Sequence, residues 1–123
     1  YGFVPHTLWD DGDPLDILIF IDEPLTQGVL VEVKPIGILR MKDEKGPDDK
    51  LLSVAINDPT YRSINDVKEV PHHLLVEIEH FFTSYKMLEN KHVESFGWDN
   101  VLAALEAVKQ GQKNYLKKKK SKK

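Results

Sequence analysis

The strand pattern of this chain starts from the stretch Asp11-Gly12-Asp13-Pro14-Leu15-Asp16, which runs directly into the apolar residues 15–21. Gly and Pro beside a short apolar run are typical of a turn that leads into a buried β-strand. Carboxylates packed into such a turn repel one another, by about 4 kcal/mol for a pair 4 Å apart at an effective dielectric constant of 20. A bound cation relieves that repulsion, and Mg²⁺ prefers oxygen ligands of this kind. The stretch therefore predicts a metal site at the mouth of a strand.

Of two other interpretations of this turn, one is excluded by the sequence and one stays open. A calcium-binding EF-hand loop starting at Asp11 is excluded, because Leu15 and Asp16 stand where the loop needs an oxygen ligand and then glycine. A plain polar turn before a strand stays open, since Asp, Gly and Pro are common turn residues.

A second acidic turn lies at residues 41–50, where Asp43, Glu44 and Asp48 precede Lys50. Like the first, it lies at the end of a predicted strand. Two such turns in one small chain predict a site for more than one metal ion.

Apolar spacing predicts several strands followed by helices. We expect strands at residues 15–21, 29–41, 52–56 and 93–96, with residues 43–50 as a hairpin connection. One helix should open at Pro71, and another should be capped by Asp99. The expected inward stripes are Leu74, Ile78, Phe81, Tyr85 and Leu88 in the first helix and Val101, Leu105 and Val108 in the second. This order favours a small twisted barrel with helices packed outside it.

Length and composition bound the class of protein. The 123 residues suffice for one domain with a core, and the absence of cysteine excludes disulfides and thiolate metal sites. No apolar run approaches the roughly 20 residues of a membrane span. We therefore expect an intracellular protein. Because the chain opens on Tyr1 rather than Met, we also expect a missing N-terminal piece.

Charge is unevenly distributed along the chain. Eight lysines and no acidic residue follow Val108, which leaves 9 basic and 20 acidic residues, a net charge of −11, in residues 1–107. We expect the lysine-rich tail at residues 117–123 to be disordered, because blocks of like charge repel. The alternatives are that this tail binds a polyanion or serves as a nuclear signal.

Five blocks of the sequence together resemble a known family. They are Tyr1-Gly2-Phe3-Val4-Pro5; Asp11-Gly12-Asp13-Pro14-Leu15-Asp16; Pro35-Ile36-Gly37 with Met41, Asp43-Glu44, Gly46, Asp48 and Lys50; His80-Phe81-Phe82 with Tyr85-Lys86 and Leu88-Glu89; and Gly97-Trp98. In order and spacing they resemble the family I soluble inorganic pyrophosphatases, over a domain at residues 1–116. The resemblance implies an OB-type five-stranded twisted barrel with two flanking helices. It also implies Mg²⁺-dependent hydrolysis of inorganic diphosphate to two phosphates.

The same resemblance implies roles for individual residues. Asp11, Asp16, Asp43 and Asp48 match metal ligands, with Asp16 bridging two ions, and Asp13 matches the general base. Tyr1, Lys50, Tyr85 and Lys86 match phosphate-binding groups, and Glu44 and Lys91 are further candidates. The family carries additional charged and tyrosine side chains upstream of the position of Tyr1. An inactive pyrophosphatase fragment is therefore one alternative function.

Another alternative is an OB-type module that binds a polyanion or nucleic acid. The converging carboxylates disfavour it, because such a module uses basic and aromatic residues at its binding face. The resemblance further implies a cytoplasmic homo-oligomer, a hexamer or dimer, with neither membrane nor nucleic acid as partner. Structural or surface roles are expected for the five histidines, and packing roles for Phe81, Phe82, Trp9 and Trp98.

Overall fold

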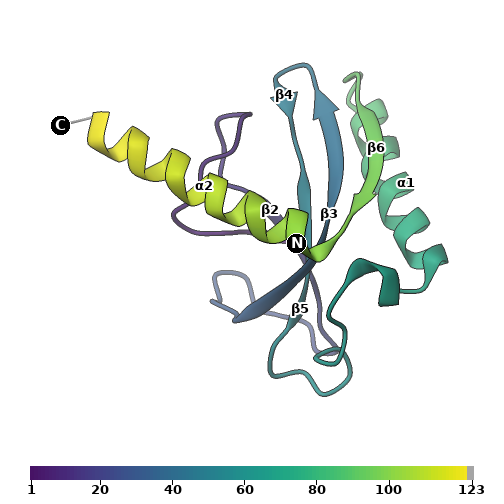
Figure 1. Cartoon of the computed structure of the whole chain (residues 1–123). Coiled ribbons are helices and arrows are strands. Elements are labelled where there is room, and N and C mark those ends of the chain that lie inside the picture. The colour runs from purple at the N-terminus through teal and green to yellow at the C-terminus, as the bar shows by residue number, and fades with distance from the viewer. Residues whose placement is uncertain (122–123) are drawn as a thin grey trace.

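A computed structural model describes residues 1–121 of the chain as a twisted mixed sheet with two long helices (Figure 1). The strands are β1 (Gly2–Phe3), β2 (Asp16–Phe20), β3 (Val33–Asp43), β4 (Gly46–Pro47), β5 (Lys50–Ala55) and β6 (Glu94–Asp99). The helices are the short 3₁₀ turn η1 (Val67–Glu69), α1 (His72–Leu88) and α2 (Val101–Ser121). The expected class, mainly β with two flanking helices, is confirmed.

The long strand β3 is the centre of the sheet. Strand order is β1-β2-β5-β3-β4, and β6 pairs with β3. β3 runs antiparallel to β4, β5 and β6, whereas β2 and β5 are parallel. The described residues thus form six strands rather than the expected five, and the pairing leaves the sheet open between β1 and β6. Two of the six strands have only two residues.

The sheet is covered on both faces. α2 packs Ala104 and Ala107 against Ile17, Ile38 and Leu51 on one face. α1 and η1 cover the other face, where Leu75 and Phe82 are the buried residues of α1. β5 begins at Lys50, two residues before the strand expected at residues 52–56, and all six of its residues are buried, whereas Ile56 lies exposed beyond it. A strand between two covered faces has no solvent side to carry polar residues.

The predicted helix faces were partly wrong. In α1 the structure buries Leu75 and Phe82, while Phe81, Tyr85 and Leu88 of the expected stripe are exposed. In α2 the buried hydrophobic residues are Ala104 and Ala107; Val108 of the predicted stripe packs against the same cluster, whereas Leu105 is exposed. The α2 cap is Asn100, whose side-chain oxygen accepts a hydrogen bond from Ala103 N at 3.0 Å. Asp99, the predicted cap, is the last residue of β6.

The lysine-rich tail departs from expectation as well. Residues 117–121 continue α2 rather than being disordered, and the helix projects beyond the sheet (Figure 1). Residues 122 and 123 of the predicted tail lie outside the described residues. None of the helices in residues 1–121 combines the length and apolar character that crossing a membrane would require.

Candidate active site

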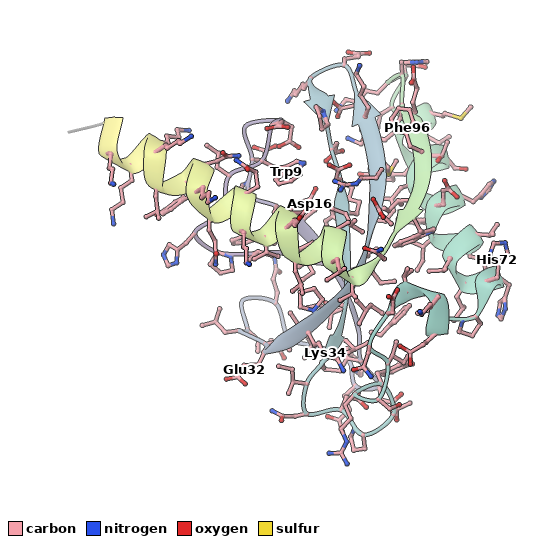
Figure 2. The ribbon with its side chains drawn as sticks, in the orientation of Figure 1. Trp9, Asp16, Glu32, Lys34, His72 and Phe96 are labelled. Carbon is pink, nitrogen blue, oxygen red and sulfur yellow. The ribbon has the colours of Figure 1, made fainter. Side chains whose placement is uncertain are left out.

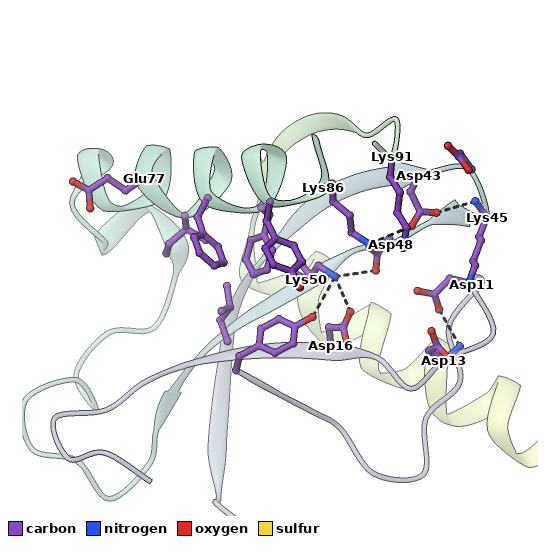
Figure 3. A pocket seen from close by; sticks show the side chains of 17 residues that line it. Asp11, Asp13, Asp16, Asp43, Lys45, Asp48, Lys50, Glu77, Lys86 and Lys91 are labelled. Atoms are coloured by element: carbon purple, nitrogen blue, oxygen red, sulfur yellow. Dashed lines mark hydrogen bonds and ion pairs between the residues drawn. The ribbon is translucent and has the colours of Figure 1, made fainter. Parts of the chain in front are cut away.

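A cleft of about 830 Å³ opens on the α1 side of the sheet, where β2 and β5 begin and β3 ends. All eleven candidate residues line it: Tyr1, Asp11, Asp13, Asp16, Asp43, Glu44, Asp48, Lys50, Tyr85, Lys86 and Lys91. They come from the N-terminus, both acidic turns, β5, α1 and the loop after α1. Parallel pairing of β2 with β5 sets Asp16 opposite Lys50, so the two acidic turns meet at one edge of the sheet (Figure 3).

Lys50 is the central cation of this cleft. Its side chain is only 4% exposed, and its Nζ donates hydrogen bonds to Asp16 Oδ2 at 2.7 Å and Asp48 Oδ1 at 2.9 Å (Figure 3). Burial alone would lower the pKa of Lys50, but the two carboxylates raise it above the usual value. The ammonium also lies 5.5 Å from the ring centre of Phe82 and donates a longer bond, 3.4 Å, to Tyr1 Oη. Lys50 is therefore held charged inside the site.

Lys86 of α1 supplies a second cation. Its Nζ lies 3.7 Å from Asp43 Oδ2 and 3.7 Å from Asp48 Oδ2. Burial would raise the pKa of Asp48, but the hydrogen bond and charge of Lys50, together with the charge of Lys86, lower it below the usual value. The carboxylate of Asp48 thus bridges the two lysines and stays ionised.

The first acidic turn presents Asp11 and Asp13 to the same cleft. Gly12 adopts φ +90°, which residues with a Cβ rarely adopt, and Asp13 N donates to Asp11 Oδ1 at 3.0 Å. Burial, and then the neighbouring Asp48 carboxylate, raise the pKa of Asp11 to about 6, although the bond from the Asp13 amide opposes this. Asp11 and Asp48, 37 residues apart in sequence, are therefore electrostatic neighbours.

The remaining candidates form the rim of the cleft. Tyr85 is half exposed and stacks on Phe81 with ring centres 6.2 Å apart. Asp43 Oδ1 accepts a hydrogen bond from Lys45 N at 2.9 Å, which holds the turn that also carries Glu44. Lys91 is paired at 3.5 Å with a neighbouring acid, Glu89.

Sequence reasoning missed part of the lining. Lys45, Glu77, Leu18, Ile78, Phe81 and Phe82 also face the cleft. Phe82 is the most informative of these, because its ring lies beneath both Lys50 and Tyr1, at 5.7 Å from the tyrosine ring. The sequence predicts a packing role for Phe82. Its contact with Lys50 depends on how α1 lies against β5, which the sequence does not show. The five histidines, by contrast, are all exposed: His6, His72, His73, His80 and His92.

The donor set of the cleft suits a hard cation. Several carboxylates converge here, and the crowding of Asp11 against Asp48 is the kind of repulsion that Mg²⁺ relieves. Within residues 1–121 no three acidic or histidine side chains already stand close enough to hold a metal ion. Lys50 and Lys86 supply positive charge next to Asp16, Asp43 and Asp48.

Comparison with known proteins gives the same class as the fold and the cleft, a phosphate-handling hydrolase. The sequence model of inorganic pyrophosphatase matches residues 1–116. An inorganic pyrophosphatase of Methanosarcina acetivorans is 47% identical over 120 residues, which are 98% of this chain and 71% of that protein. That of Saccharolobus solfataricus is 46% identical over 112 residues, 89% of this chain and 65% of that protein.

Solved structures agree with these sequence matches. The inorganic pyrophosphatase of Helicobacter pylori superposes with a TM-score of 0.87 at 39% identity, over 93% of this chain and 69% of that one. The Thermus thermophilus enzyme gives a TM-score of 0.86 at 44% identity, over 92% and 67%. The chain therefore belongs to the inorganic pyrophosphatase family, hydrolases that split inorganic diphosphate into two phosphates.

Proposed function

We propose that this cleft binds inorganic diphosphate together with several Mg²⁺ ions and hydrolyses it to two phosphates. The observation that carries the proposal is the meeting of five aspartates with Lys50, Tyr85 and Lys86 in one cleft. Carboxylates suit Mg²⁺, and lysines with a tyrosine suit phosphate oxygens. A site that offers both at once fits a substrate that is itself a polyanion.

Asp11, Asp16 and Asp48 are the proposed ligands of the first metal ions, with Asp16 shared between two of them, and Asp43 is the proposed ligand of an ion that arrives with substrate. Bound Mg²⁺ would lower the pKa of a water molecule and offset the charge of diphosphate. In the described structure Lys50 and Lys86 form ion pairs with Asp16, Asp43 and Asp48. Their ammonium groups are then already in the cleft when an anionic substrate enters.

Asp13 is the proposed general base. Its side chain is exposed in the cleft beside Asp11, and its backbone N–H is fixed by the Asp11 carboxylate. A carboxylate oxygen within hydrogen-bond reach of the attacking water can accept a proton from that water, which makes the water oxygen a stronger nucleophile. The turn geometry around Gly12 keeps the two neighbouring carboxylates in different positions and so permits different tasks.

Tyr1, Lys50, Tyr85 and Lys86 are the proposed holders of the phosphate groups, with Lys91 and Glu44 at the rim. Lys50 is the most constrained of them, since burial and three neighbours fix its position. A fixed positive charge stabilises the leaving phosphate without having to reorganise during the reaction.

We further propose a cytoplasmic homo-oligomer, a hexamer or dimer. α1 exposes Met87 and Leu88, which do not line the cleft, at 65% and 84%, and this is apolar surface that a second copy could cover. Light scattering of the purified chain measures the mass directly, and a monomer at all concentrations would contradict this part. An OB-type module for nucleic acid is not favoured, because carboxylates dominate the cleft.

The test of the activity is phosphate release from inorganic diphosphate with Mg²⁺, with a chelator, and with Mg²⁺ restored. We expect release that stops with chelator and returns with Mg²⁺. Asp16→Asn should abolish it, whereas Asp10→Asn, an exposed acid outside the cleft, should not. Phosphate release at an undiminished rate in chelator would overturn the proposed metal dependence, and no release in any condition would overturn the activity.

A further inference from the structure

Asp49 is a buried carboxylate that the proposed mechanism does not use. Only 6% exposed, it lies between two cleft residues, Asp48 and Lys50, yet does not line the cleft. Its Oδ1 accepts a hydrogen bond from Met41 N at 3.1 Å. Its Oδ2 accepts one from the indole Nε1 of Trp9 at 3.1 Å and a longer one from Arg40 Nη1 at 3.4 Å. Burying a charge is costly unless it is paired, so these contacts constrain Asp49 tightly.

Trp9 in turn closes the loop that carries the first acidic turn. Its backbone N–H donates to Asp13 O at 2.8 Å, and its carbonyl accepts from Gly12 N at 3.0 Å. Its ring packs against the core cluster that includes Ala104 and Ala107 of α2 (Figure 2). A displacement of Trp9 must therefore move residues 10–13 with it.

Other anchors of this loop act upstream of the acidic turn. Leu8 N donates to Gly111 O of α2 at 2.9 Å, and Asn114 Nδ2 donates to Leu8 O at 3.1 Å. Thr7 Oγ1 accepts from Leu15 N at 3.1 Å and so joins the two ends of the loop. The hydrogen bond from Trp9 to Asp49 differs from these, because it ties the first acidic turn directly to the second.

The tie has a geometric consequence for the cleft. Asp48 and Asp49 are adjacent, and one carboxylate enters the cleft while the other holds Trp9. Asp11 is therefore linked to Asp48 through few atoms: the loop that Trp9 closes, the hydrogen bond from Trp9 to Asp49, and the peptide bond between Asp49 and Asp48. Arg40, which also lies 3.8 Å from Asp99 Oδ2, braces the far side of Asp49.

We propose that Asp49 and Trp9 are a positioning pair that holds the Asp11–Asp13 turn at the right distance from Asp48 for metal binding. The inference rests on the proposed function of the cleft. Neither residue touches substrate or metal, and both act through the carboxylates that they place. Residues that orient metal ligands typically change metal affinity by about 10- to 100-fold when they are removed.

The main variant is Trp9→Phe, which keeps an aromatic ring but removes the indole donor without changing charge. The matched control is Trp98→Phe, because Trp98 Nε1 also donates one 3.1 Å hydrogen bond, to Leu75 O. Trp98 packs on the two core clusters beneath α1, not on the cluster that Trp9 contacts. Asp49→Ala, which removes both carboxylate oxygens, and the double variant Trp9→Phe/Asp49→Ala complete a double-mutant cycle. Calorimetry measures the Mg²⁺ affinity of each variant. NMR records the backbone and indole N–H resonances in metal-free protein.

We expect Trp9→Phe to weaken Mg²⁺ binding about 10-fold and Trp98→Phe to change it less than about twofold, with similar losses of melting temperature. The double variant Trp9→Phe/Asp49→Ala should bind little worse than either single one, because the hydrogen bond between Trp9 and Asp49 is missing in all three. In metal-free protein the amide resonances of residues 10–13 should shift in Asp49→Ala, which changes no ring and lies 40 residues from Trp9 in sequence, but not in Trp98→Phe.

Two results would overturn the positioning pair. One is unchanged amide resonances of residues 10–13 in Asp49→Ala, which needs no metal to be measured. The other is equal Mg²⁺ affinity of Trp9→Phe and Trp98→Phe in a parent protein that binds Mg²⁺. If the parent neither binds Mg²⁺ nor releases phosphate, the proposed function fails, and the amide resonances still decide whether the tie exists.

Discussion

Along residues 48–50 the side chains alternate between two environments. Asp48 and Lys50 line the cleft, whereas Asp49 turns toward Trp9 and Arg40. In extended chain successive side chains point to opposite sides, so this alternation needs no unusual backbone. Three consecutive polar residues can therefore serve the cleft and its support at the same time.

Asp13 carries the first prediction at this scale. Asp13→Asn keeps the shape of the side chain but cannot accept a proton, so turnover should fall by roughly 10² to 10⁴, which is the usual contribution of a general base. Mg²⁺ affinity should stay within a few-fold of the parent value. Steady-state phosphate release and calorimetry measure the two effects, and an unchanged turnover across the pH range would remove Asp13 from the mechanism.

Asp11 carries a prediction about pH and stability without metal. Its folded-state pKa is raised to about 6, above the ordinary 3.8, so the neutral form is favoured on folding. Its stabilising contribution is complete below pH 3.8 and is lost as the pH rises through 6. Asp11→Asn, which is always neutral, should therefore melt higher than the parent at pH 8 and equally at pH 4.

The expected gain at pH 8 is about 1 kcal/mol, or roughly 3 to 5 °C, once solvent screening of this partly exposed carboxyl is allowed for. Asp10→Asn is the control for removing one negative charge from the same loop, because Asp10 is exposed and outside the cleft. Thermal melts in the presence of chelator provide the data. A gain of equal size for both variants would assign the effect to net charge alone.

At the scale of elements, η1 approaches β3 most tightly at Gly37. A Cβ on Gly37 would lie 2.7 Å from Val67 Cβ and 3.1 Å from Asp99 O, and β3 shifts its register to β5 between Pro35 and Gly37. Close contact with a backbone oxygen leaves little room for repacking. The glycine therefore sets how β3, η1 and the end of β6 fit together.

Gly37→Ala should accordingly lower the free energy of unfolding by about 2 to 3 kcal/mol. Gly2→Ala is the matched control, since Gly2 is also a strand glycine but a Cβ there would meet nothing within 4 Å. It should change stability by less than about 0.5 kcal/mol. Urea unfolding compares the two, and equal midpoints would show that β3 and η1 adjust without cost.

Strand positions were more predictable from sequence than helix faces. β2 and β6 fall within a few residues of their expected positions, because apolar runs bounded by turn residues admit few alternatives. β3 begins at Val33 rather than 29, since nothing in its alternation marks where pairing with β5 starts. α1 carries apolar residues around most of its circumference, so its inward face depends on β3 and β5 and not on its own spacing.

The cleft was more predictable than its support. Its polar residues share recognisable turn motifs, and all the candidates lie in one cleft. The contribution of Asp49 could not be predicted, because it looks like one more acid in an acidic turn until its indole partner, 40 residues away, is known. Contacts of that separation are fixed by the packing of α2 and the sheet together, which no local pattern encodes.

At the scale of the whole molecule, lysine side chains occupy the cleft beside the carboxylates that are proposed to bind Mg²⁺. Lys50 and Lys86 together lie within 4 Å of Asp16, Asp43 and Asp48. A metal ion that enters must compete with these lysines and, below about pH 6, with a proton on Asp11. Because the carboxylates come from both acidic turns, a bound ion would also link parts of the chain that separate on unfolding.

Mg²⁺ should therefore stabilise the whole chain and not only the cleft. At a free concentration 100 times its dissociation constant, the free energy of unfolding should rise by about 2.7 kcal/mol. For 123 residues this corresponds to roughly 10 °C in melting temperature. The shift should be smaller at pH 5, below the pKa of about 6 for Asp11, where protons compete for that carboxylate.

NaCl at the same ionic strength is the control for simple screening of the acidic body, and Asp16→Asn is the control for the site. A shift of the same size in NaCl, or in Asp16→Asn with Mg²⁺, would show that the ion does not act by joining the two acidic turns.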